Sequence, residues 1–441
     1  MAGLNVAWTL KKAGVASTLY EASGRAGGRM MSVSNALIPG VRTEFGGEFI
    51  DTNHRDIHSL ASEFSLKLLD RRNSAINELI RQAYFIDGKV YSEEDVAEAL
   101  RPLLPTLQSH ASVLTSVPTF EAPGAAEILD KTPLSRYLAE LRLPNWLWKL
   151  LEAAFVTEYG LELGKQSALN LLITIPTVND DGSVSMFGDS DERYKIAGGN
   201  ARLPEAIASR LNSQIRYSSV LKSVSMKAGR YQLEFVTSGA SQTTEADIVV
   251  LAIPFSVLRG VTLDLDLPDW KTRAIRELPY GTNTKVMMGF SRRIWREKGF
   301  VGEVFSDEQF QLAWDNTELE HSPAGALTIY TGGDAGVEAT KIKLQVQVES
   351  YLELLEKIFP GISNTRNSKQ ARMNWIDNPF SKGSYASYGP GHWTSIRGAE
   401  FKPIGNLHFA GEHCSLDFQG FMNGAAETGR RAAENILASL K

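Results

Sequence analysis

The sequence predicts an α/β fold in which one parallel-sheet domain is assembled from segments at the start, middle and end of the chain. Three observations predict it: a helix followed by a strand at 4–22, a near-continuous apolar run at 246–254, and a strand, loop and helix at 405–440. An apolar run of this kind is typical of a parallel strand that helices cover on both faces. We therefore expect two inserted blocks between these three units.

The first unit has the pattern of half a nucleotide-binding motif. Residues 4–13 carry apolar side chains on one helical face, and Gly14 stands where a helix commonly ends. The stretch VASTLYEA at 15–22 then predicts a short buried strand that ends at Glu21. Helix, glycine, strand and terminal acid form the second half of a dinucleotide-binding βαβ unit, in which the acid binds a ribose. Gly3 would supply the last glycine of the G-x-G-x-x-G turn.

Glycines and arginines follow the terminal acid directly. The stretch EASGRAGGRM places Arg25, Gly28 and Arg29 after Glu21, and TEFGGEFI follows at 43–50. Paired glycines let backbone N–H groups approach a phosphate closely, and an arginine can bind it with two hydrogen bonds. Together these motifs resemble the FAD-binding start of the flavin-containing amine oxidase family. The resemblance extends over nearly the whole length of the chain.

The resemblance implies a discontinuous Rossmann-like FAD-binding domain and a substrate domain of mixed sheet with a helical insertion. Helical periodicity dominates 55–170, and short strands are predicted after 194. The expected domains are 1–54, 190–262 and 396–441 for FAD, 55–189 for the helical insertion and 263–395 for the substrate.

Residues that contact FAD are implied at motif positions throughout these segments. Val220 and Ala252, for example, stand on strands that in the family pass beside the adenosine, although a plain core strand is an equally good interpretation of the first. The implied residues are Gly3, Glu21, Arg25, Gly28, Arg29, Gly46, Gly47, Glu48, Phe49, Val220, Ala252, Trp375, Gly411, Glu412, Gly420, Phe421 and Met422.

The C-terminal stretch carries the most specific motif. HFAGEH at 408–413 puts Gly411 and Glu412 directly after a short apolar strand, and a helix begins near Met422. In the family, this acid and the neighbouring backbone meet the ribityl and pyrophosphate part of FAD. The free N–H groups at the helix start would point at the N1–C2=O edge of the flavin, where negative charge accumulates on reduction. Such a helix would raise the oxidising power of the flavin.

Lys285 stands within the otherwise apolar strand predicted at 282–290. A buried lysine is energetically unfavourable unless it has a hydrogen-bond or ion-pair partner, so we expect a role for Lys285. The resemblance supplies one, a hydrogen bond through water to flavin N5. A lysine on an exposed strand face is the alternative, since Thr282 and Thr284 flank it.

The resemblance also implies two aromatic walls of a substrate cage. Tyr385 lies in NWIDNPFSKGSYASYGPG at 374–391, and Phe421 stands where the opposing ring is expected. Two rings facing the flavin would exclude water, favour the neutral amine and align its Cα–H bond with N5. Ser384 stands where the monoamine oxidase branch has a cysteine bonded to the flavin. We therefore expect non-covalent FAD.

The predicted function is FAD-dependent oxidation of an amine by hydride transfer to flavin N5. The imine would hydrolyse to an aldehyde or keto product and ammonia, and O₂ would reoxidise the flavin to give H₂O₂. Phe49 stands where L-amino acid oxidases hold the substrate carboxylate with an arginine, which favours an amine without a carboxylate. L-Amino acid oxidase remains the alternative, because Arg42 or Arg193 could reach the site. Glu158 and Tyr159 are expected at the entrance.

A third interpretation is a non-catalytic scaffold that holds flavin poorly. The first strand of the βαβ unit is missing from the sequence, and two glycines of the phosphate turn are missing with it. That strand would be central in a parallel sheet, so its loss would expose apolar sheet edges and weaken FAD binding. We expect either that the natural protein starts upstream or that this chain retains flavin weakly.

Composition excludes several other classes of function. A net charge of −5 does not suggest a nucleic-acid surface, and no apolar run reaches the roughly 18 residues of a membrane span. Cys414 is the only cysteine, and the seven histidines show no metal-ligand spacing, so we expect no metal. The expected partners are a small amine or amino acid and O₂, and a homodimer is one assembly open to the chain. The sequence leaves the compartment open between cytoplasm and export.

Overall fold

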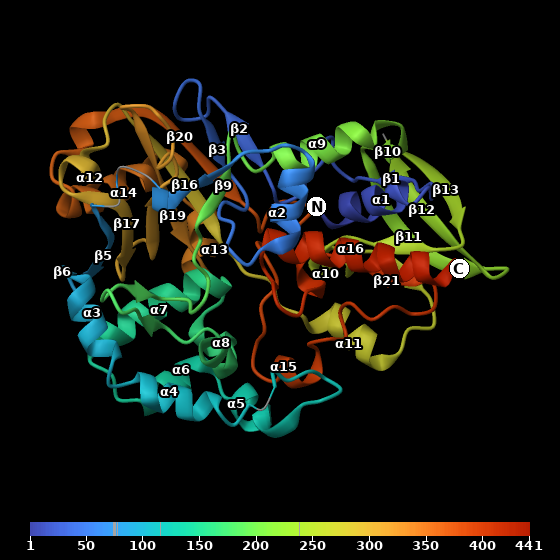
Figure 1. The fold of residues 1–441 in the computed structure, drawn as a ribbon, viewed down its shortest axis with the longest axis horizontal. Helices are drawn as coiled ribbons and strands as arrows, with labels where there is room; N and C mark the ends of the chain where they lie inside the picture. The colour runs from blue at the N-terminus through green and yellow to red at the C-terminus, as the bar shows by residue number, and fades with distance from the viewer. Residues whose placement is uncertain (74–75, 77, 115, 238) are drawn as a thin grey trace.

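The computed structural model describes residues 1–73, 76, 78–114, 116–237 and 239–441, and Figure 1 shows its elements. The segments from the start, middle and end of the chain lie side by side, which confirms the predicted α/β class. These elements are α1 (Ala2–Lys12), β1 (Leu19–Tyr20), β10 (Ile215–Arg216), β14 (Val249–Leu251), β21 (Leu407–Phe409) and α16 (Met422–Ser439).

The two helices α1 and α16 pack closely because small residues separate their backbones. A side chain at Gly429 would bring its Cβ within 2.5 Å of the carbonyl oxygen of Ala2. The Asn5 side chain donates a hydrogen bond of 2.6 Å to the carbonyl oxygen of Ala426, which ties the first helix to the last. The first and the last helix of the chain are therefore packed directly against each other.

Two of the parallel pairings in the described part of the chain form separate two-stranded sheets. β1 pairs with β10, and β14 pairs with β21. The strand predicted at 15–22 is confirmed only at Leu19 and Tyr20, because β10 offers partners at these two positions alone. Residues of both β1 and β14 line the cavity described below.

A four-stranded sheet begins directly after β10 in the sequence. Its order is β13–β12–β11–β15, and β12 is antiparallel to both of its neighbours. The four strands are β11 (Ser219–Lys227), β12 (Arg230–Thr237), β13 (Ala240–Ala246) and β15 (Thr262–Asp264).

A seven-stranded mixed sheet forms the other large layer, in the order β20–β16–β19–β18–β17–β5–β6. Every residue of β16 is buried, and α14 (Leu344–Ile358) packs its apolar side chains against this sheet. The strands are β5 (Ile80–Ile86), β6 (Lys89–Tyr91), β16 (Thr284–Phe290), β17 (Phe300–Ser306), β18 (Leu312–Asp315), β19 (Gly325–Thr331) and β20 (Arg366–Asn374).

The block predicted as helical at 55–189 is only partly helical. Its strands β5 and β6 join the seven-stranded sheet, and β5 pairs in parallel with β17, which lies more than 200 residues away in the chain. Apart from α2 (Arg55–Glu63), the helices of this block lie below that sheet in Figure 1. They are α3 (Glu93–Leu100), α4 (Leu104–Ala111), α5 (Glu127–Lys131), α6 (Leu134–Glu140), α7 (Asn145–Tyr159) and α8 (Ala168–Ile173). The domain boundaries given above stay predictions.

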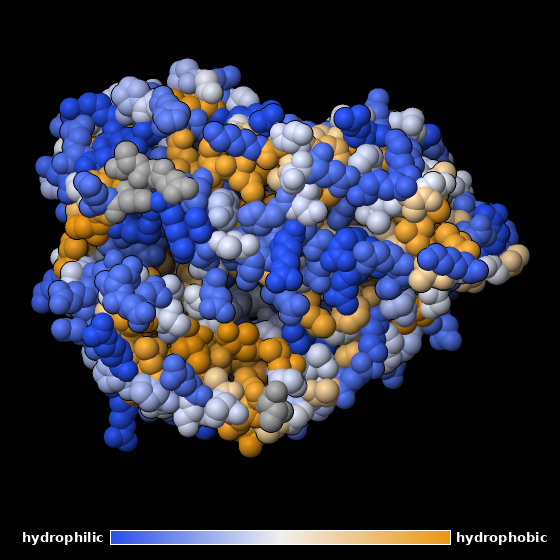
Figure 2. All heavy atoms as spheres, in the orientation of Figure 1, coloured by the Kyte–Doolittle hydropathy of each residue, from blue (hydrophilic) through white to orange (hydrophobic). Residues whose placement is uncertain are grey.

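Polar side chains cover most of the face shown in Figure 2, and apolar ones gather over the helical block. Among the described residues, none of the helices has the length and apolar content that a membrane crossing needs.

Candidate active site

One large cavity runs through the molecule between the parallel pairs, the seven-stranded sheet and the helical block. Its volume is about 2270 Å³, well above the roughly 300–1,000 Å³ of ordinary small-molecule pockets. Its lining includes every residue that the sequence analysis assigned to catalysis or to FAD, from Gly3 at one end of the chain to Met422 at the other. The structure therefore brings the predicted site residues together, while their individual roles stay predictions.

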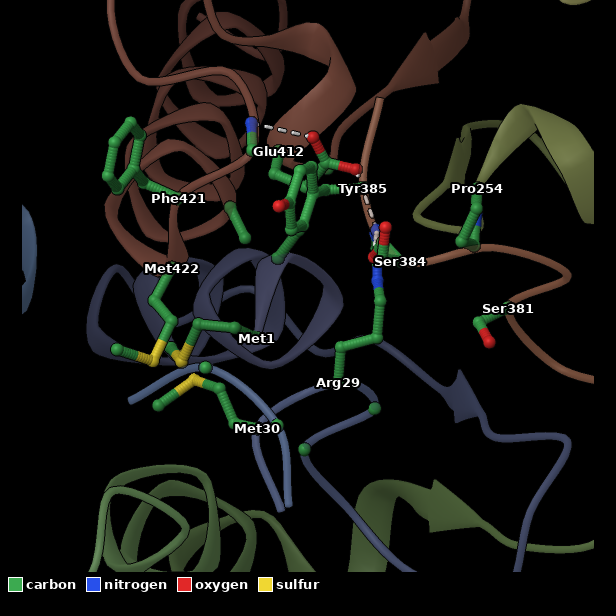
Figure 3. A pocket seen from close by; sticks show the side chains of 18 of the residues that line it. Met1, Arg29, Met30, Pro254, Ser381, Ser384, Tyr385, Glu412, Phe421 and Met422 are labelled. Atoms are coloured by element: carbon green, nitrogen blue, oxygen red, sulfur yellow. Dashed lines mark hydrogen bonds and ion pairs between the residues drawn. The ribbon is translucent and has the colours of Figure 1, made fainter. Parts of the chain in front are cut away.

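Two helix N-termini open into this cavity. Met1 and Gly3 line it at the start of α1, and Phe421 and Met422 line it at the start of α16. Neither helix has a side-chain cap at this end, so the first N–H groups of each are free to bind a ligand. Figure 3 shows Met1, Met30 and Met422 meeting at this side of the pocket. Two uncapped N-termini attract negative charge, which suits a phosphate-bearing cofactor.

Glu412 connects three segments of the chain that line the cavity. Its carboxylate accepts hydrogen bonds of 2.8 Å from Arg29 Nη1 and from the backbone N–H of Gly420, and one of 3.2 Å from Ala386 N–H. The same Arg29 nitrogen donates to the carbonyl oxygen of Ser384 at 2.7 Å, and these side chains meet in Figure 3. A nearly buried ion pair thus joins the N-terminal loop, the 384–386 segment and the start of α16.

The loop after β1 has the conformation that the glycines suggest. Gly28 has φ +57°, which a residue with a side chain rarely adopts. Arg25 donates to the carbonyl oxygens of Ala26 and Met30 at 3.2 Å, so it holds its own loop in place. The Glu21 carboxylate at the end of β1 accepts hydrogen bonds from the N–H and hydroxyl of Ser23.

The glycine pair at 46–47 packs against this loop with no room for side chains. A Cβ at Gly46 would lie 1.7 Å from the carbonyl oxygen of Arg29, and one at Gly47 would lie 2.8 Å from the Met422 side chain. These glycines let the chain approach the start of α16. They also place Glu48 and Phe49 on the cavity wall.

Lys285 is buried, and the alternative of an exposed strand face is therefore wrong. Its ammonium donates to Glu48 Oε2 and to the carbonyl oxygen of Gly46, both at 2.9 Å. Lys195 binds the other oxygen of Glu48 at 2.8 Å. Burial acts to raise the pKa of Glu48, but the two lysines outweigh it and lower the pKa to about 2. This triad was not predicted, although its carboxylate stands in the GGEFI stretch and its second lysine in YKIAGG.

The two predicted aromatic residues both face the cavity. The Tyr385 hydroxyl donates to the carbonyl oxygen of Thr157 at 2.8 Å and lies 3.2 Å from the Tyr330 hydroxyl. Phe421 packs against the buried His54, with ring centroids 5.1 Å apart. Figure 3 shows both rings beside the start of α16. Tyr330 completes this wall and was not predicted.

The position of the serine beside Tyr385 bears on how a cofactor is held. Ser384 Oγ donates to Asn283 Oδ1 at 2.6 Å, and Ser384 lines the cavity. Cys414 is buried and is not part of the lining. The residues around the cavity therefore offer no thiol to a flavin ring.

Carboxylates gather at the end of the cavity formed by α7 and the 190–193 segment. Glu158 and Glu192 both line the cavity. Burial, and then the charge of Asp51, raise the pKa of Glu158 to about 7. Burial also raises the pKa of Glu192 well above its ordinary value, although Arg71 acts against it. Glu158 was expected at the entrance, whereas Glu192 was missed.

The arginines near this end are occupied by protein carboxylates. Arg71 lies over the Phe49 ring at 4.4 Å and binds Glu318 at 2.8 Å and Glu303 at 3.4 Å. Arg193, one of the two arginines considered for a substrate carboxylate, lines the cavity but donates to Asp70 through Nε and Nη2. Those two hydrogen bonds measure 2.9 and 2.6 Å. The other, Arg42, binds Glu205 and is not part of the lining.

Comparisons with known proteins agree with this geometry. A family model described as flavin containing amine oxidoreductase matches residues 1–437. A flavin-containing amine oxidase of Oncorhynchus mykiss is 22% identical over 458 residues, which cover 99% of this chain and 84% of the relative. A putative L-amino-acid oxidase of Bacillus subtilis, YobN, is 25% identical over 461 residues, covering 99% of this chain and 92% of the relative.

Solved structures show the same fold. Putrescine oxidase bound to putrescine superposes with a TM-score of 0.84 at 20% identity, over 99% of this chain and 97% of that one. Cyclohexylamine oxidase from Brevibacterium oxydans gives a TM-score of 0.84 at 20% identity, over 100% of this chain and 97% of that one. The family match spans the cavity and both ends of the fold. The chain therefore belongs to the flavin containing amine oxidoreductase family.

Proposed function

We propose that this protein is an FAD-dependent amine oxidase that binds its cofactor without a covalent bond. The family implies a flavin cofactor. One observation carries the proposal: a single cavity collects two uncapped helix N-termini, a buried lysine and two aromatic walls from distant parts of the chain. The starts of α1 and α16, Glu21, Arg29 and the 46–47 backbone would hold FAD.

The chemistry divides between cofactor and protein. The chemistry that bound FAD would supply is two-electron oxidation: a hydride from the carbon that bears the amine would be taken up and its electrons passed to O₂, giving imine and H₂O₂. Tyr385 and Phe421 would exclude water and orient the neutral amine. Lys285 is held in place by Glu48, and we assign it to the oxygen reaction of the reduced cofactor. The imine then hydrolyses in water to an aldehyde or ketone and ammonia.

An amine without a carboxylate fits the cavity better than an amino acid does. Arg71 and Arg193 are bound by protein carboxylates, and Glu158, which has no ion pair among the described residues, would repel an anionic substrate. L-Amino acid oxidation is the second candidate. Two observations favour it: Arg193 lines the cavity, and a putative L-amino-acid oxidase is 25% identical over nearly the whole chain.

A peroxide assay on purified protein tests the proposal. We expect yellow protein with close to one flavin per chain, release of that flavin on acid precipitation, and H₂O₂ formation with amines but not with L-amino acids. Peroxide formed only with L-amino acids would select the second candidate. Colourless protein that gains no activity when FAD is added would instead support a scaffold.

A further inference from the structure

The loop that carries Tyr385 must be held in place if its ring is to orient an amine. Ser384 and Tyr385 both line the cavity and stand between β20 and α15 (His392–Ser395), outside any helix or strand (Figure 3). A displacement of about 1 Å at a group that orients the substrate can slow a reaction by up to about 100-fold. A loop lacks the backbone hydrogen bonds that fix a strand, so side chains have to supply the restraint.

Asn283 connects this loop to the end of α7. It is fully buried and stands directly before β16. Its Oδ1 accepts a hydrogen bond of 2.6 Å from the Ser384 hydroxyl, and its Nδ2 donates one of 2.8 Å to the carbonyl oxygen of Thr157. A carbonyl oxygen can only accept, so a single orientation of the amide satisfies both partners.

The Thr157 carbonyl oxygen also holds the Tyr385 ring. The Tyr385 hydroxyl donates to it at 2.8 Å, so this oxygen accepts from both Asn283 and Tyr385. A hydroxyl has one proton to donate. The Tyr330 hydroxyl, 3.2 Å from that of Tyr385, must therefore be the donor of this second contact. The tip of the Tyr385 ring is thus restrained by two neighbours, and the residue before it, Ser384, is restrained by Asn283.

Glycines form the space that Asn283 occupies. A Cβ at Gly160 would lie 2.2 Å from Asn283 Oδ1, and one at Gly281 would lie 2.8 Å from the same atom. A Cβ at Gly332 would approach Nδ2 to 3.0 Å. These glycines follow α7, precede β16 and follow β19. The backbone of three separate parts of the chain therefore packs closely around this one amide.

We propose that Asn283 is a positioning residue that fixes the orientation of the Tyr385 ring. It does so by holding Ser384 and the Thr157 carbonyl oxygen in one arrangement, and the Tyr330 hydroxyl gives a second support. The inference rests on the proposed function, in which this ring orients the amine. Asn283 is not part of the cavity lining, so it acts on the reaction through Tyr385.

Asn283→Asp tests the restraint without changing the size of the side chain. The ionised carboxylate still accepts from Ser384 but has no donor for the Thr157 carbonyl oxygen, whereas the protonated acid has one. Burial raises the pKa of such a carboxyl group. We expect the rate constant of anaerobic flavin reduction, relative to wild type, to fall about 10-fold at about pH 9 and to recover at about pH 6. Division by the wild-type value at each pH removes the effect of protonation of the amine itself.

Asn367→Asp is the matched control. Its Nδ2 donates to the Leu37 carbonyl oxygen at 3.0 Å, and its Oδ1 accepts from the Lys369 N–H at 3.0 Å. A Cβ at Gly289 would lie 2.5 Å from this Oδ1. Asn367 is not part of the cavity lining, so we expect the reduction rate to stay unchanged at both pH values. The titratable groups around Asn283 are present in both variants and in wild type, and their own titration largely cancels: Glu158, Glu192, Lys285, Tyr330 and Tyr385.

A second set of variants tests the ring from its hydroxyl. Tyr330→Phe should slow flavin reduction about 3–10-fold in wild type. It should have no further effect in Tyr385→Phe, which has already lost the hydroxyl that Tyr330 supports. Tyr351→Phe removes a buried hydroxyl on α14 that accepts from Gln347 at 3.0 Å and lies outside the lining, so it should leave the rate unchanged.

Fluorine NMR reads the ring without catalysis. 3-Fluorotyrosine is placed at position 385 in wild type and in Asn283→Asp. The variant should give a broader or an additional line at about pH 9, because its ring takes more than one orientation, and should match wild type at about pH 6.

The outcomes are distinct. Wild-type reduction rates and wild-type fluorine spectra in Asn283→Asp at about pH 9 overturn the inference while amine oxidation stands. A loss of equal size at both pH values, an equal loss in Asn367→Asp, or additive losses in Tyr330→Phe and Tyr385→Phe also overturn it, because each indicates a general structural effect. Flavin-loaded wild type that oxidises no amine overturns the proposed function, and the fluorine spectra then still decide whether Asn283 holds the ring. If Asn283→Asp does not fold, the two tyrosine variants decide.

Discussion

The Glu158 carboxylate should cost the protein stability at neutral and alkaline pH. Its pKa is raised from an ordinary 4.5 to about 7, first by burial and then by Asp51. Between these values the unfolded chain releases the proton that the folded protein retains. Stability therefore falls as pH rises from about 4.5 to 7 and stays reduced above that range. Replacing the group by Glu158→Gln removes the loss, because glutamine stays neutral in both states.

The magnitude follows from the difference between the two pKa values. A tenfold change in proton affinity is worth about 1.4 kcal/mol, so the carboxylate would cost about 3 kcal/mol if the effect were complete. Glu158 is partly open to the cavity, and screening there reduces the cost to about 1–3 kcal/mol. An unfolding entropy of about 2.1 cal/mol/K per residue makes 1 kcal/mol worth about 1 °C for a chain of 441 residues.

Thermal unfolding of the holoprotein between about pH 4 and pH 9, without substrate, tests this reasoning. Glu158→Gln should melt about 1–3 °C above wild type at about pH 8 and together with it at about pH 4. Asp51, Glu192, Tyr330 and Tyr385 also face Glu158, but they are present in both proteins, so their own titration largely cancels in the comparison. A Tm difference independent of pH, or a less stable variant at about pH 8, would refute the argument.

Three further predictions concern the rest of the cavity. Lys285→Met should slow reoxidation of the reduced cofactor by O₂ in stopped-flow measurements and leave anaerobic reduction nearly unchanged; an unaltered oxygen rate would reject its assignment. Arg29→Ala removes the donor to Glu412 and to the Ser384 carbonyl, so FAD should bind about 10–100-fold more weakly to reconstituted apoprotein. Gly46→Ala places a Cβ 1.7 Å from a backbone oxygen and should sharply lower soluble yield and Tm, whereas Gly24→Ala, where a Cβ meets nothing within 4 Å, should behave like wild type.

Local patterns predicted the backbone features around the cavity where particular backbone shapes are required. The loop at Gly28 needs a positive φ, the pair at Gly46 and Gly47 needs close backbone approach, and α16 begins at Met422 as the motif indicates. Such requirements leave a trace in a short stretch of sequence. For this reason the motifs, although spread over more than 400 residues, all mark the lining of one cavity.

Contacts between side chains that are far apart in the sequence produce no local pattern of this kind. Glu48 meets Lys195 and Lys285 across 147 and 237 positions, and no periodicity relates them. The strand β5 was missed for a similar reason, since its parallel partner β17 follows much later in the chain. Its sequence IRQAYFI lies inside a block whose helical periodicity dominates the prediction. The length of β1 likewise depends on how many partners β10 provides.

The contrast between Glu48 and Glu158 shows how neighbouring charges decide the protonation of a carboxylate that burial alone would keep neutral. Both carboxylates line the same cavity, yet the pKa of Glu48 is lowered to about 2 while that of Glu158 is raised to about 7. The lysines explain the first, because they stabilise the charged form that burial alone would disfavour. Nothing in the described part of the protein does the same for Glu158. The same kind of side chain therefore favours folding of the charged form at Glu48 and opposes it at Glu158.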